Sequence, residues 1–115
     1  MVTFFKNEYS IDIRKRESKQ IMNKYTDRVP IIVEPHDDKC PIINKKKYLA
    51  PHDITLGQFT YVIRKHLKLK PEQAIFIIIN HTLVSSSENI ITIYEKHKDD
   101  DDFLYVVYSL ENTFG

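Results

Sequence analysis

The stretch Thr55-Leu-Gly-Gln-Phe-Thr-Tyr-Val-Ile-Arg-Lys-His-Leu67 predicts an amphipathic helix on which the rest of the fold depends. Thr55 and Gln58 have the spacing of a capping box, in which each side chain satisfies a free backbone N–H group of the other residue. Apolar side chains recur with helical spacing at positions 56, 59, 62, 63 and 67, which gives the helix one face for a core. We expect Lys70-Pro71 to close this helix.

Two strands are predicted before this helix. Val29–Val33 is rich in β-branched residues, and Pro30 is expected where the ladder needs no N–H donor. Residues 36–44 are expected to form a loop, and residues 46–50 a second strand that ends at Pro51. The close spacing of the two strands predicts a hairpin with a long turn.

The pattern after the helix predicts two more strands and one short helix. Apolar runs rich in β-branched and aromatic residues indicate the strands, and a serine cluster offers an N-cap before the short helix. In chain order we expect a buried strand over 74–79, a turn at Asn80-His81, a short return at Leu83-Val84, an N-cap cluster over 85–88, a helix over 90–97, a final strand over 103–108 and a free tail over 109–115.

The N-terminal part of the chain is polar, basic and thinly apolar. Residues 7–25 are expected to form a surface helix with Ser10 as its N-cap, and Thr3 is a candidate cap for a shorter first turn containing Phe4 and Phe5. We expect this part to be loosely docked and its basic face to be solvated. That face consists of Arg14, Lys15, Arg16, Lys19 and Lys24.

The order of the predicted elements is a helical preamble, two strands, a helix, a strand, a short helix and a strand. A hairpin followed by a crossover helix and a later central strand is the β-grasp arrangement, an α+β fold. We expect residues 1–26 to form an N-terminal helical extension and residues 27–115 to form the β-grasp domain with its tail. The 115 residues suffice for one domain with its own core.

Composition excludes several classes of protein. A hydrophobic fraction of 42% with 29% charged residues predicts a soluble globule. The longest apolar run is far shorter than the ~20 residues that span a bilayer, and the N-terminus lacks a secretory signal, so we expect a cytosolic protein. Cys40, the single cysteine, can form neither an internal disulfide nor a cysteine-rich zinc site.

No residue cluster predicts catalysis or metal binding. The five histidines lack ligand spacing, Cys40 is expected to be inert, and the acidic run Asp99–Asp102 is expected to be a solvated turn. The chain has no glycine-rich phosphate loop, and its basic N-terminal stretch lacks the interleaved aromatic residues typical of nucleic-acid binding. We therefore expect a protein that is not an enzyme, needs no metal or cofactor and does not bind nucleic acid.

Four segments of the chain form a recognisable set. They are Tyr25-Thr-Asp-Arg-Val-Pro-Ile-Ile-Val-Glu34, Lys45-Lys-Lys-Tyr-Leu-Ala-Pro51, Ile54-Thr-Leu-Gly-Gln-Phe59 and Phe103-Leu-Tyr-Val-Val-Tyr-Ser109. Together with Phe114-Gly115 they resemble the autophagy-related protein eight family of ubiquitin-like modifiers, which includes the GABA-receptor-associated protein and light chain three. The resemblance covers essentially the whole chain and implies a ubiquitin-like β-grasp fold with two additional N-terminal helices.

The resemblance also implies a chemistry located at Gly115. In the family the terminal carboxylate is adenylated by an activating enzyme, passed as a thioester between enzyme cysteines and joined to the amine of phosphatidylethanolamine. A glycine suits a tail that enters narrow enzyme channels, because it has no side chain. A chain ends in glycine by chance roughly once in fourteen, but Phe114 before it also matches the family. The family usually carries extra residues that a cysteine protease removes, so we expect this chain, as given, to be ready for activation.

A docking surface for short partner motifs is implied as well. An extended peptide would pair with the edge formed by residues 47–49 and place an aromatic and an aliphatic side chain in two pockets. By resemblance, the first pocket is lined by Glu17, Ile21, Pro30, Lys47, Leu49 and Phe103. The second is lined by Tyr48, Pro51, Ile54, Phe59, Val62 and Ile63. Acidic residues that flank the motif would meet Lys45, Lys47, Arg28 and Arg64. His66 stands where the family usually has arginine, and we hypothesise that it weakens binding of acidic motifs or makes it depend on pH.

Other interpretations of these residues stay open. Leu49, Phe59, Val62 and Ile63 would face the core of any β-grasp domain, and the lysines could guard an edge strand against aggregation. Gly115 could be joined to a protein lysine instead of a lipid, or the chain could be a purely non-covalent adaptor. The expected partners are activating and conjugating enzymes, a delipidating cysteine protease, cargo receptors and phosphatidylethanolamine. The expected location is the cytoplasm, and after lipidation an autophagosomal or other organelle membrane.

Overall fold

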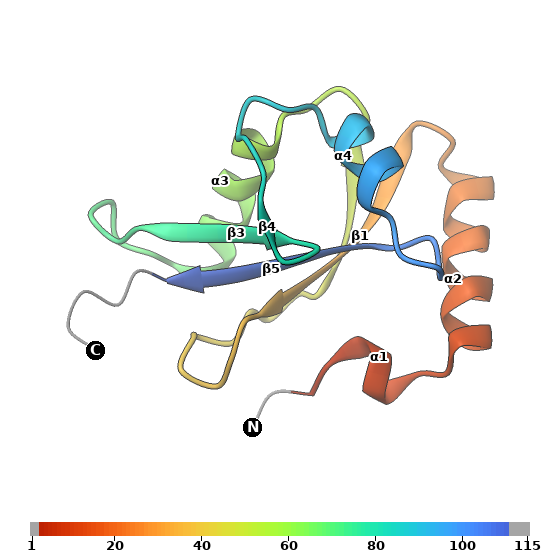
Figure 1. Ribbon diagram of the computed structural model, residues 1–115, viewed down its shortest axis with the longest axis horizontal. Coiled ribbons are helices and arrows are strands. Elements are labelled where there is room, and N and C mark those ends of the chain that lie inside the picture. The colour runs from red at the N-terminus through yellow and green to blue at the C-terminus, as the bar shows by residue number, and fades with distance from the viewer. Residues whose placement is uncertain (1–2, 111–115) are drawn as a thin grey trace.

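A mixed five-stranded sheet forms the centre of the computed structural model, which describes residues 3–110 (Figure 1). The sheet has the strand order β2-β1-β5-β3-β4, with β1 and β5 parallel and the other neighbours antiparallel. This hairpin, crossover helix and central last strand confirm the predicted α+β fold of the ubiquitin-like β-grasp type. The elements are α1 (Phe5–Glu8), α2 (Ile11–Lys24), β1 (Arg28–Pro35), β2 (Lys47–Pro51), α3 (Leu56–Leu67), β3 (Ile75–Ile79), β4 (Thr82–Leu83), α4 (Ile90–His97) and β5 (Leu104–Leu110).

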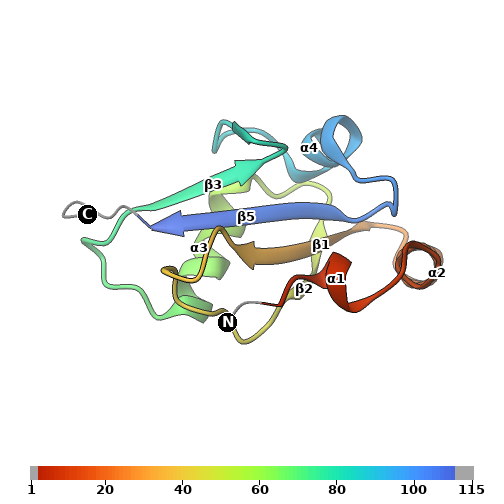
Figure 2. The same cartoon turned by 60° about the horizontal axis from the view of Figure 1, so that its bottom comes forward.

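The two faces of the sheet carry separate apolar clusters. Ile31 of β1 belongs to the larger cluster with Ile63 of α3, whereas the next residue, Ile32, belongs to a smaller cluster with Phe5 of α1. Successive residues of a strand point to opposite faces. Helices α3 and α1 therefore cover opposite faces of the sheet, as Figure 2 shows. We call the face beneath α1 the outer face.

The capping box of α3 is confirmed. The Gln58 N–H donates to the Thr55 hydroxyl at 3.2 Å, and the Thr55 N–H donates to the Gln58 side chain at 2.8 Å. The end of α3 was predicted wrongly, because the helix stops at Leu67 rather than at Lys70-Pro71. Lys68 adopts a left-handed φ of 56° there, and a left-handed C-cap turns the chain before the proline is reached.

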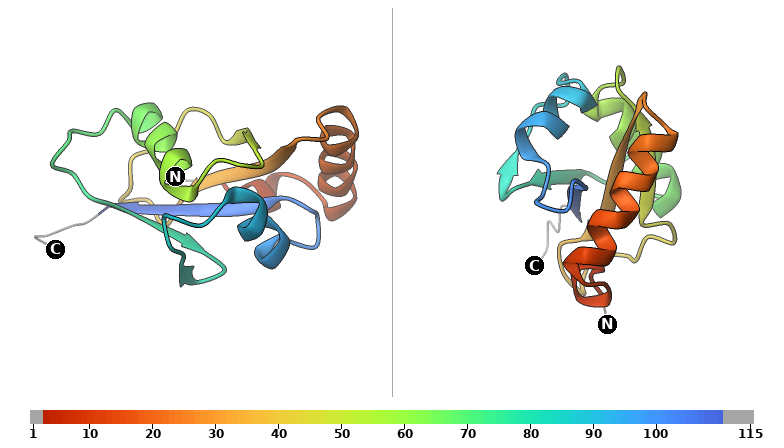
Figure 3. Two further views of the ribbon diagram at one scale, coloured as in Figure 1. Left: turned by 90° about the horizontal axis from the view of Figure 1, so that it is seen from above. Right: turned by 90° about the vertical axis from the view of Figure 1, so that its right-hand side faces the viewer.

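The N-terminal part differs most from the prediction made from residue pattern. Two helices, α1 and α2, replace the single helix over residues 7–25, as the family resemblance implied. The Ser10 hydroxyl accepts the Ile13 N–H and caps α2 as predicted, but Phe4 rather than Thr3 precedes α1 and provides no side-chain cap. Phe5 is only 2% exposed, so the expectation of loose docking was wrong. Helix α2 stands at the end of the sheet where β5 begins (Figures 1 and 3).

Three further predictions were wrong in detail. β3 is not buried on both faces, because α3 covers one face only and Phe76 on the other is 45% exposed. Asn89 rather than the serine cluster occupies the N-cap of α4, and its side chain makes no capping bond. β5 continues to Leu110, which pairs with Ile75, so residues 109–110 belong to the sheet. The rest of the predicted tail lies outside the described residues.

Candidate functional site

Strand β2 lies at one edge of the sheet and offers backbone groups to a partner. The Val33 N–H donates to the Lys46 carbonyl at 2.8 Å, which marks that pair as hydrogen-bonded in the antiparallel ladder. Hydrogen-bonded and non-hydrogen-bonded pairs alternate, so Ile32 and Lys47, and likewise Pro30 and Leu49, are non-hydrogen-bonded pairs. The N–H and C=O groups of Lys47 and Leu49 therefore face away from β1. The missing N–H of Pro30 costs no bond to β2, as predicted.

The side chains of β2 alternate between the two faces of the sheet. Lys47 is exposed and Leu49 half-buried, whereas Tyr48 and Ala50 are buried in the cluster beneath α3. A peptide that paired with this edge would have access to both faces, since its own side chains alternate in the same way.

The six residues of the first predicted pocket come from α2, from strands β1 and β2 and from the residue that precedes β5. Glu17 of α2 forms an ion pair with Lys47 of β2, and Ile21 packs in the cluster that contains Phe103. Leu49 lies opposite Pro30 in the ladder. Phe103 itself is 1% exposed. It therefore packs beneath the other residues of this region and offers no accessible surface to a ligand.

Phe5 is a member of this region that residue pattern did not single out. Its ring makes an edge-on contact with Phe103 at a centroid distance of 5.4 Å, and the Lys47 ammonium lies 5.6 Å from its centroid. Phe5 thus occupies the apolar space beside the Lys47–Glu17 pair. The apolar dipeptide Phe4-Phe5 in an otherwise polar N-terminus was the available signal for such a role.

The second predicted group lies between β2 and α3. Tyr48, Phe59 and Ile63 are buried core residues, and the Tyr48 and Phe59 rings meet edge-on at 5.5 Å. Burial raises the pKa of Tyr48 to about 12, so its hydroxyl stays protonated at neutral pH. The half-buried members of this group, which form its accessible part, are Pro51, Ile54 and Val62.

The four basic residues expected to meet acidic partner residues have different neighbours. Arg28 donates to the Leu49 carbonyl at 3.4 Å, directly on the open edge. The Lys45 ammonium lies 5.0 Å from the Tyr48 ring, and His66 meets the same ring edge-on. Arg64 donates to the carbonyls of Lys70 and Gln73 at 2.9 and 2.7 Å. Arg64 therefore holds the loop after α3, while Arg28, Lys45 and Lys47 lie around β2.

A buried ion pair fixes α2, and with it Glu17 and Ile21, against the sheet. Arg14 donates to the Asp101 carboxylate at 2.6 Å, and the Ser18 hydroxyl donates to the Asp101 carbonyl at 2.6 Å. Tyr105 also donates to this carboxylate at 2.5 Å, and burial together with that bond raises the pKa of Tyr105. Asp101 is 0% exposed, so the prediction of a solvated turn over Asp99–Asp102 was wrong for this residue, although the segment does form a turn in which Asp100 is exposed.

Some predicted features cannot be placed in this structure. Phe114 and Gly115 lie outside the described residues.

Within residues 3–110, no group of three or more His, Cys, Asp or Glu side chains is arranged to hold a metal ion. No helix in the same range is both long and apolar enough to cross a bilayer.

The arrangement matches a known family of proteins. Residues 13–115 match the family model described as "Autophagy protein Atg8 ubiquitin like". The chain belongs to the Atg8 family. Autophagy-related protein 8 of Mycosarcoma maydis is 54% identical over 116 residues, which cover 100% of this chain and 98% of that protein. Autophagy-related protein 8 of Schizosaccharomyces pombe is 54% identical over 112 residues, covering 96% of this chain and 93% of that protein.

Solved Atg8 structures have the same fold as this chain. Trypanosoma brucei ATG8 superposes with a TM-score of 0.91 at 36% identity, with 100% of both chains covered. Plasmodium falciparum Atg8, solved in complex with a Plasmodium falciparum Atg3 peptide, superposes with a TM-score of 0.86 at 30% identity, covering 94% of this chain and 96% of that one. The chain is thus an Atg8-family ubiquitin-like autophagy protein throughout its length, including the N-terminal helices.

Proposed function

We propose that this Atg8-family chain is a lipid-conjugated modifier that also docks short aromatic-x-x-aliphatic motifs of cargo receptors. The observation that carries the proposal is the β2 edge, where the backbone groups of Lys47 and Leu49 face outward between two sets of apolar side chains. Family membership supplies the conjugation half of the proposal, together with the terminal Gly115.

The conjugation step is an acyl transfer at the Gly115 carbonyl. An activating enzyme adenylates the carboxylate, an enzyme thiol displaces the adenylate, and the phosphatidylethanolamine amine displaces the thiol to leave an amide. The amine loses a proton and the thiol regains one, so the step needs no redox partner. β5, the last described strand before Gly115 in the sequence, ends at the opposite end of the sheet from α2 (Figure 1).

Docking uses the β2 edge in β-augmentation. A partner peptide extends the sheet beside Lys47 and Leu49, its aromatic residue lies near Ile21 and Leu49, and its aliphatic residue lies near Ile54 and Val62. Acidic residues flanking the motif meet Arg28, Lys45 and Lys47. This assignment is supported by the half-buried, apolar character of the accessible residues on both faces.

The proposed partners are those of a ubiquitin-like pathway. The Plasmodium relative was solved with an Atg3 peptide, and by analogy we propose an Atg3-type conjugating enzyme as a partner of this chain. An activating enzyme and a delipidating cysteine protease complete the set. The protein is proposed to be cytoplasmic until lipidation places it on autophagosomal or related membranes.

Mass spectrometry of the membrane-associated protein tests the conjugation. We expect an amide between Gly115 and an ethanolamine phospholipid, and none when Gly115 is replaced by Ala. A branched peptide to a protein lysine would show the alternative, conjugation to protein. A free carboxylate on membrane-bound protein, unaffected by Gly115→Ala, would show a non-covalent adaptor and overturn the proposal.

A further inference from the structure

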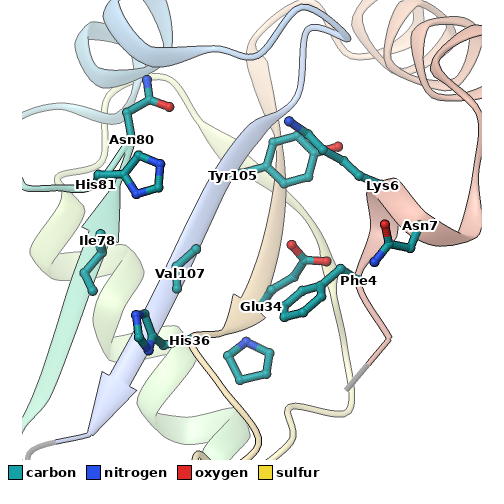
Figure 4. A pocket seen from close by; sticks show the side chains of 11 residues that line it. Phe4, Lys6, Asn7, Glu34, His36, Ile78, Asn80, His81, Tyr105 and Val107 are labelled. Atoms are coloured by element: carbon teal, nitrogen blue, oxygen red, sulfur yellow. The ribbon is translucent and has the colours of Figure 1, made fainter. Parts of the chain in front are cut away.

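A cavity of about 710 Å³ opens on the outer face of the sheet, away from the β2 edge. Its floor is formed by Ile78 of β3, Val107 of β5 and the ring of Tyr105, with Phe4 on one wall. Figure 4 shows Val107 between Ile78 on one side and Glu34 and Phe4 on the other. Neither Ile78 nor Val107 belongs to the apolar clusters described above, so their side chains are available to a ligand.

Glu34 supplies a buried carboxylate at the wall of this cavity. Only 6% of the residue is exposed to solvent. One carboxylate oxygen, Oε2, accepts the Phe5 N–H at 2.6 Å, and the other, Oε1, accepts no hydrogen bond from residues 3–110. A carboxylate in a largely buried residue, with one oxygen that has no donor among the described residues, favours a ligand that brings a donor.

Among the charged groups around the cavity, the Glu34 carboxylate forms no ion pair within 4.0 Å with the described residues. Two cations that act electrostatically on Glu34 form ion pairs with other carboxylates: Lys6 pairs with Asp99 at 2.5 Å and Lys46 pairs with Glu8 at 3.0 Å. Of the histidines on the rim, His36 lies 3.3 Å from the carboxylate of Asp37. Lys6 and His36 are therefore each beside a carboxylate, which makes them poorer partners for an anionic ligand. The cavity therefore combines an apolar floor of Ile78 and Val107 with the Glu34 carboxylate, while the Lys6 ammonium, paired with Asp99, lies 4.7 Å from the centroid of the Tyr105 ring.

We propose that this cavity binds a lysine side chain of a partner protein. The aliphatic stem of lysine suits the floor of Ile78 and Val107, and its ammonium is a compact donor that suits the single free oxygen of Glu34. Arginine fits less well, because its planar guanidinium group binds best when it donates to two carboxylate oxygens at once. Glu34 offers only one free oxygen. This surface is separate from the β2 edge, so one partner can occupy it while a motif peptide occupies the edge.

Titration of the ¹⁵N-labelled full chain with a short probe peptide tests the proposal. The probe is acetyl-Ala-Ala-Lys-Ala-Ala-amide, and the matched probes carry norleucine or Nε-acetyl-lysine in place of lysine. We expect saturable shifts of the Asn7, Ile78 and Val107 amides with the lysine peptide and at least about tenfold weaker binding of both neutral peptides. Equal binding of the norleucine peptide, or no saturable shift with lysine, would overturn the proposal.

Variants separate this site from an effect on folding. Glu34→Gln keeps an acceptor for the Phe5 N–H but removes the charge, and should weaken binding about tenfold. Ile78→Ser should also weaken it, while Glu95→Gln, an exposed change on α4, should not. Free pentylamine provides the last arm. If it shifts the same amides while the lysine peptide does not, the cavity takes a small amine and not a partner's side chain, which would contradict the assignment.

Discussion

Asp101 is a fully buried carboxylate that organises the contact between the N-terminal helices and the sheet. Its two oxygens accept bonds from Arg14, Tyr105 and the Phe103 N–H, and its carbonyl accepts the Ser18 hydroxyl. A buried charge is tolerated only when such donors surround it. Docking of α2 is therefore specified by polar groups on the face that carries Arg14 and Ser18.

Replacing Arg14 by Met should destabilise the protein strongly. The substitution keeps an apolar stem but leaves Asp101 buried without its cation, and loss of one partner of a buried pair costs about 3 kcal/mol or more. Urea unfolding measures the change. Lys15→Met, at the neighbouring exposed position, should change stability by no more than about 0.5 kcal/mol. Equal effects of the two substitutions would show that the ion pair contributes nothing.

Glu34 should give the protein a distinct pH dependence. Burial raises its pKa above the ordinary 4.5, and the nearby Glu8 adds to that rise, while the Phe5 N–H, Lys46 and Lys6 oppose it. His36, which lines the same cavity as Glu34, comes directly after Pro35, the last residue of β1. The native state therefore holds this proton more tightly than the unfolded chain, so protonation of Glu34 favours the folded protein as the pH falls.

The measurement is the stability of Glu34→Gln minus that of the wild type, followed from neutral pH downward. The substituted glutamine cannot gain the proton, so the difference should be largest near neutrality and shrink as the pH falls through the raised pKa of Glu34. Glu95→Gln serves as the control and should show no such trend. A difference for Glu34→Gln that grows on acidification would have the wrong sign for a buried carboxylate.

Among the elements, the two edge strands β2 and β4 differ in what surrounds them. Leu49 of β2 is half-buried and lies opposite Pro30, whereas Leu83 of β4 is 68% exposed. A partner peptide gains apolar contact only where side chains and backbone groups are offered together. The β2 edge meets that condition through Lys47, Leu49 and the neighbouring helix.

Leu49→Ala should weaken binding of an aromatic-x-x-aliphatic peptide about tenfold, because part of the apolar surface covered by the peptide is removed. Leu83→Ala is the matched control, a leucine on the opposite edge strand, and should leave affinity unchanged. Isothermal titration calorimetry with one motif peptide measures both. Loss of affinity in the Leu83 variant alone would place docking on the other edge.

At the scale of the whole molecule, the N-terminal helices form part of the folded unit. Phe5, Ile32 and Phe103 make a cluster on the outer face while α3 closes the larger cluster on the other. The sheet is thus covered on both faces at β1, whereas β3 stays uncovered on the outer face. Unfolding of α1 would expose apolar surface and leave Glu34 without its Phe5 contact.

Phe5→Ala should therefore lower the global free energy of unfolding by about 3 kcal/mol. Phe76→Ala, at a phenylalanine that is 45% exposed on the same outer face, should cost much less. Urea unfolding combined with hydrogen exchange separates two outcomes. If Phe5→Ala accelerates exchange only in α1 and leaves global stability unchanged, the N-terminal helices are an appendage and this account is wrong.

Local patterns predicted the elements of the sheet and its crossover helix well. The capping box at Thr55, the β-branched run before Glu34 and the final strand all act through neighbours within a few residues, so the sequence displays them directly. Boundaries were less predictable. Lys68 ends α3 by adopting a left-handed conformation, for which a lysine gives no signal.

The candidate site was predicted in part. Lys47 and Leu49 were expected on an open edge and lie there, and Glu17 and Ile21 lie beside them. Arg64 was expected to meet acidic partners, and this stays a prediction. The structure adds that Arg64 donates to loop carbonyls, acceptors that the sequence does not reveal. Phe5 was not expected in the first pocket, since its partner Phe103 is distant in sequence.

The sequence by itself determined the β-grasp order of elements and the family, because these depend on local spacing and on the residues themselves. Only the tertiary structure decided that Asp101 is a buried anchor and that Glu34 faces an apolar cavity. Both residues are acidic and would be solvated in isolation. Their burial follows from groups far away in the chain, Arg14 for one and Phe5 with Val107 for the other, which meet only when the sheet is complete.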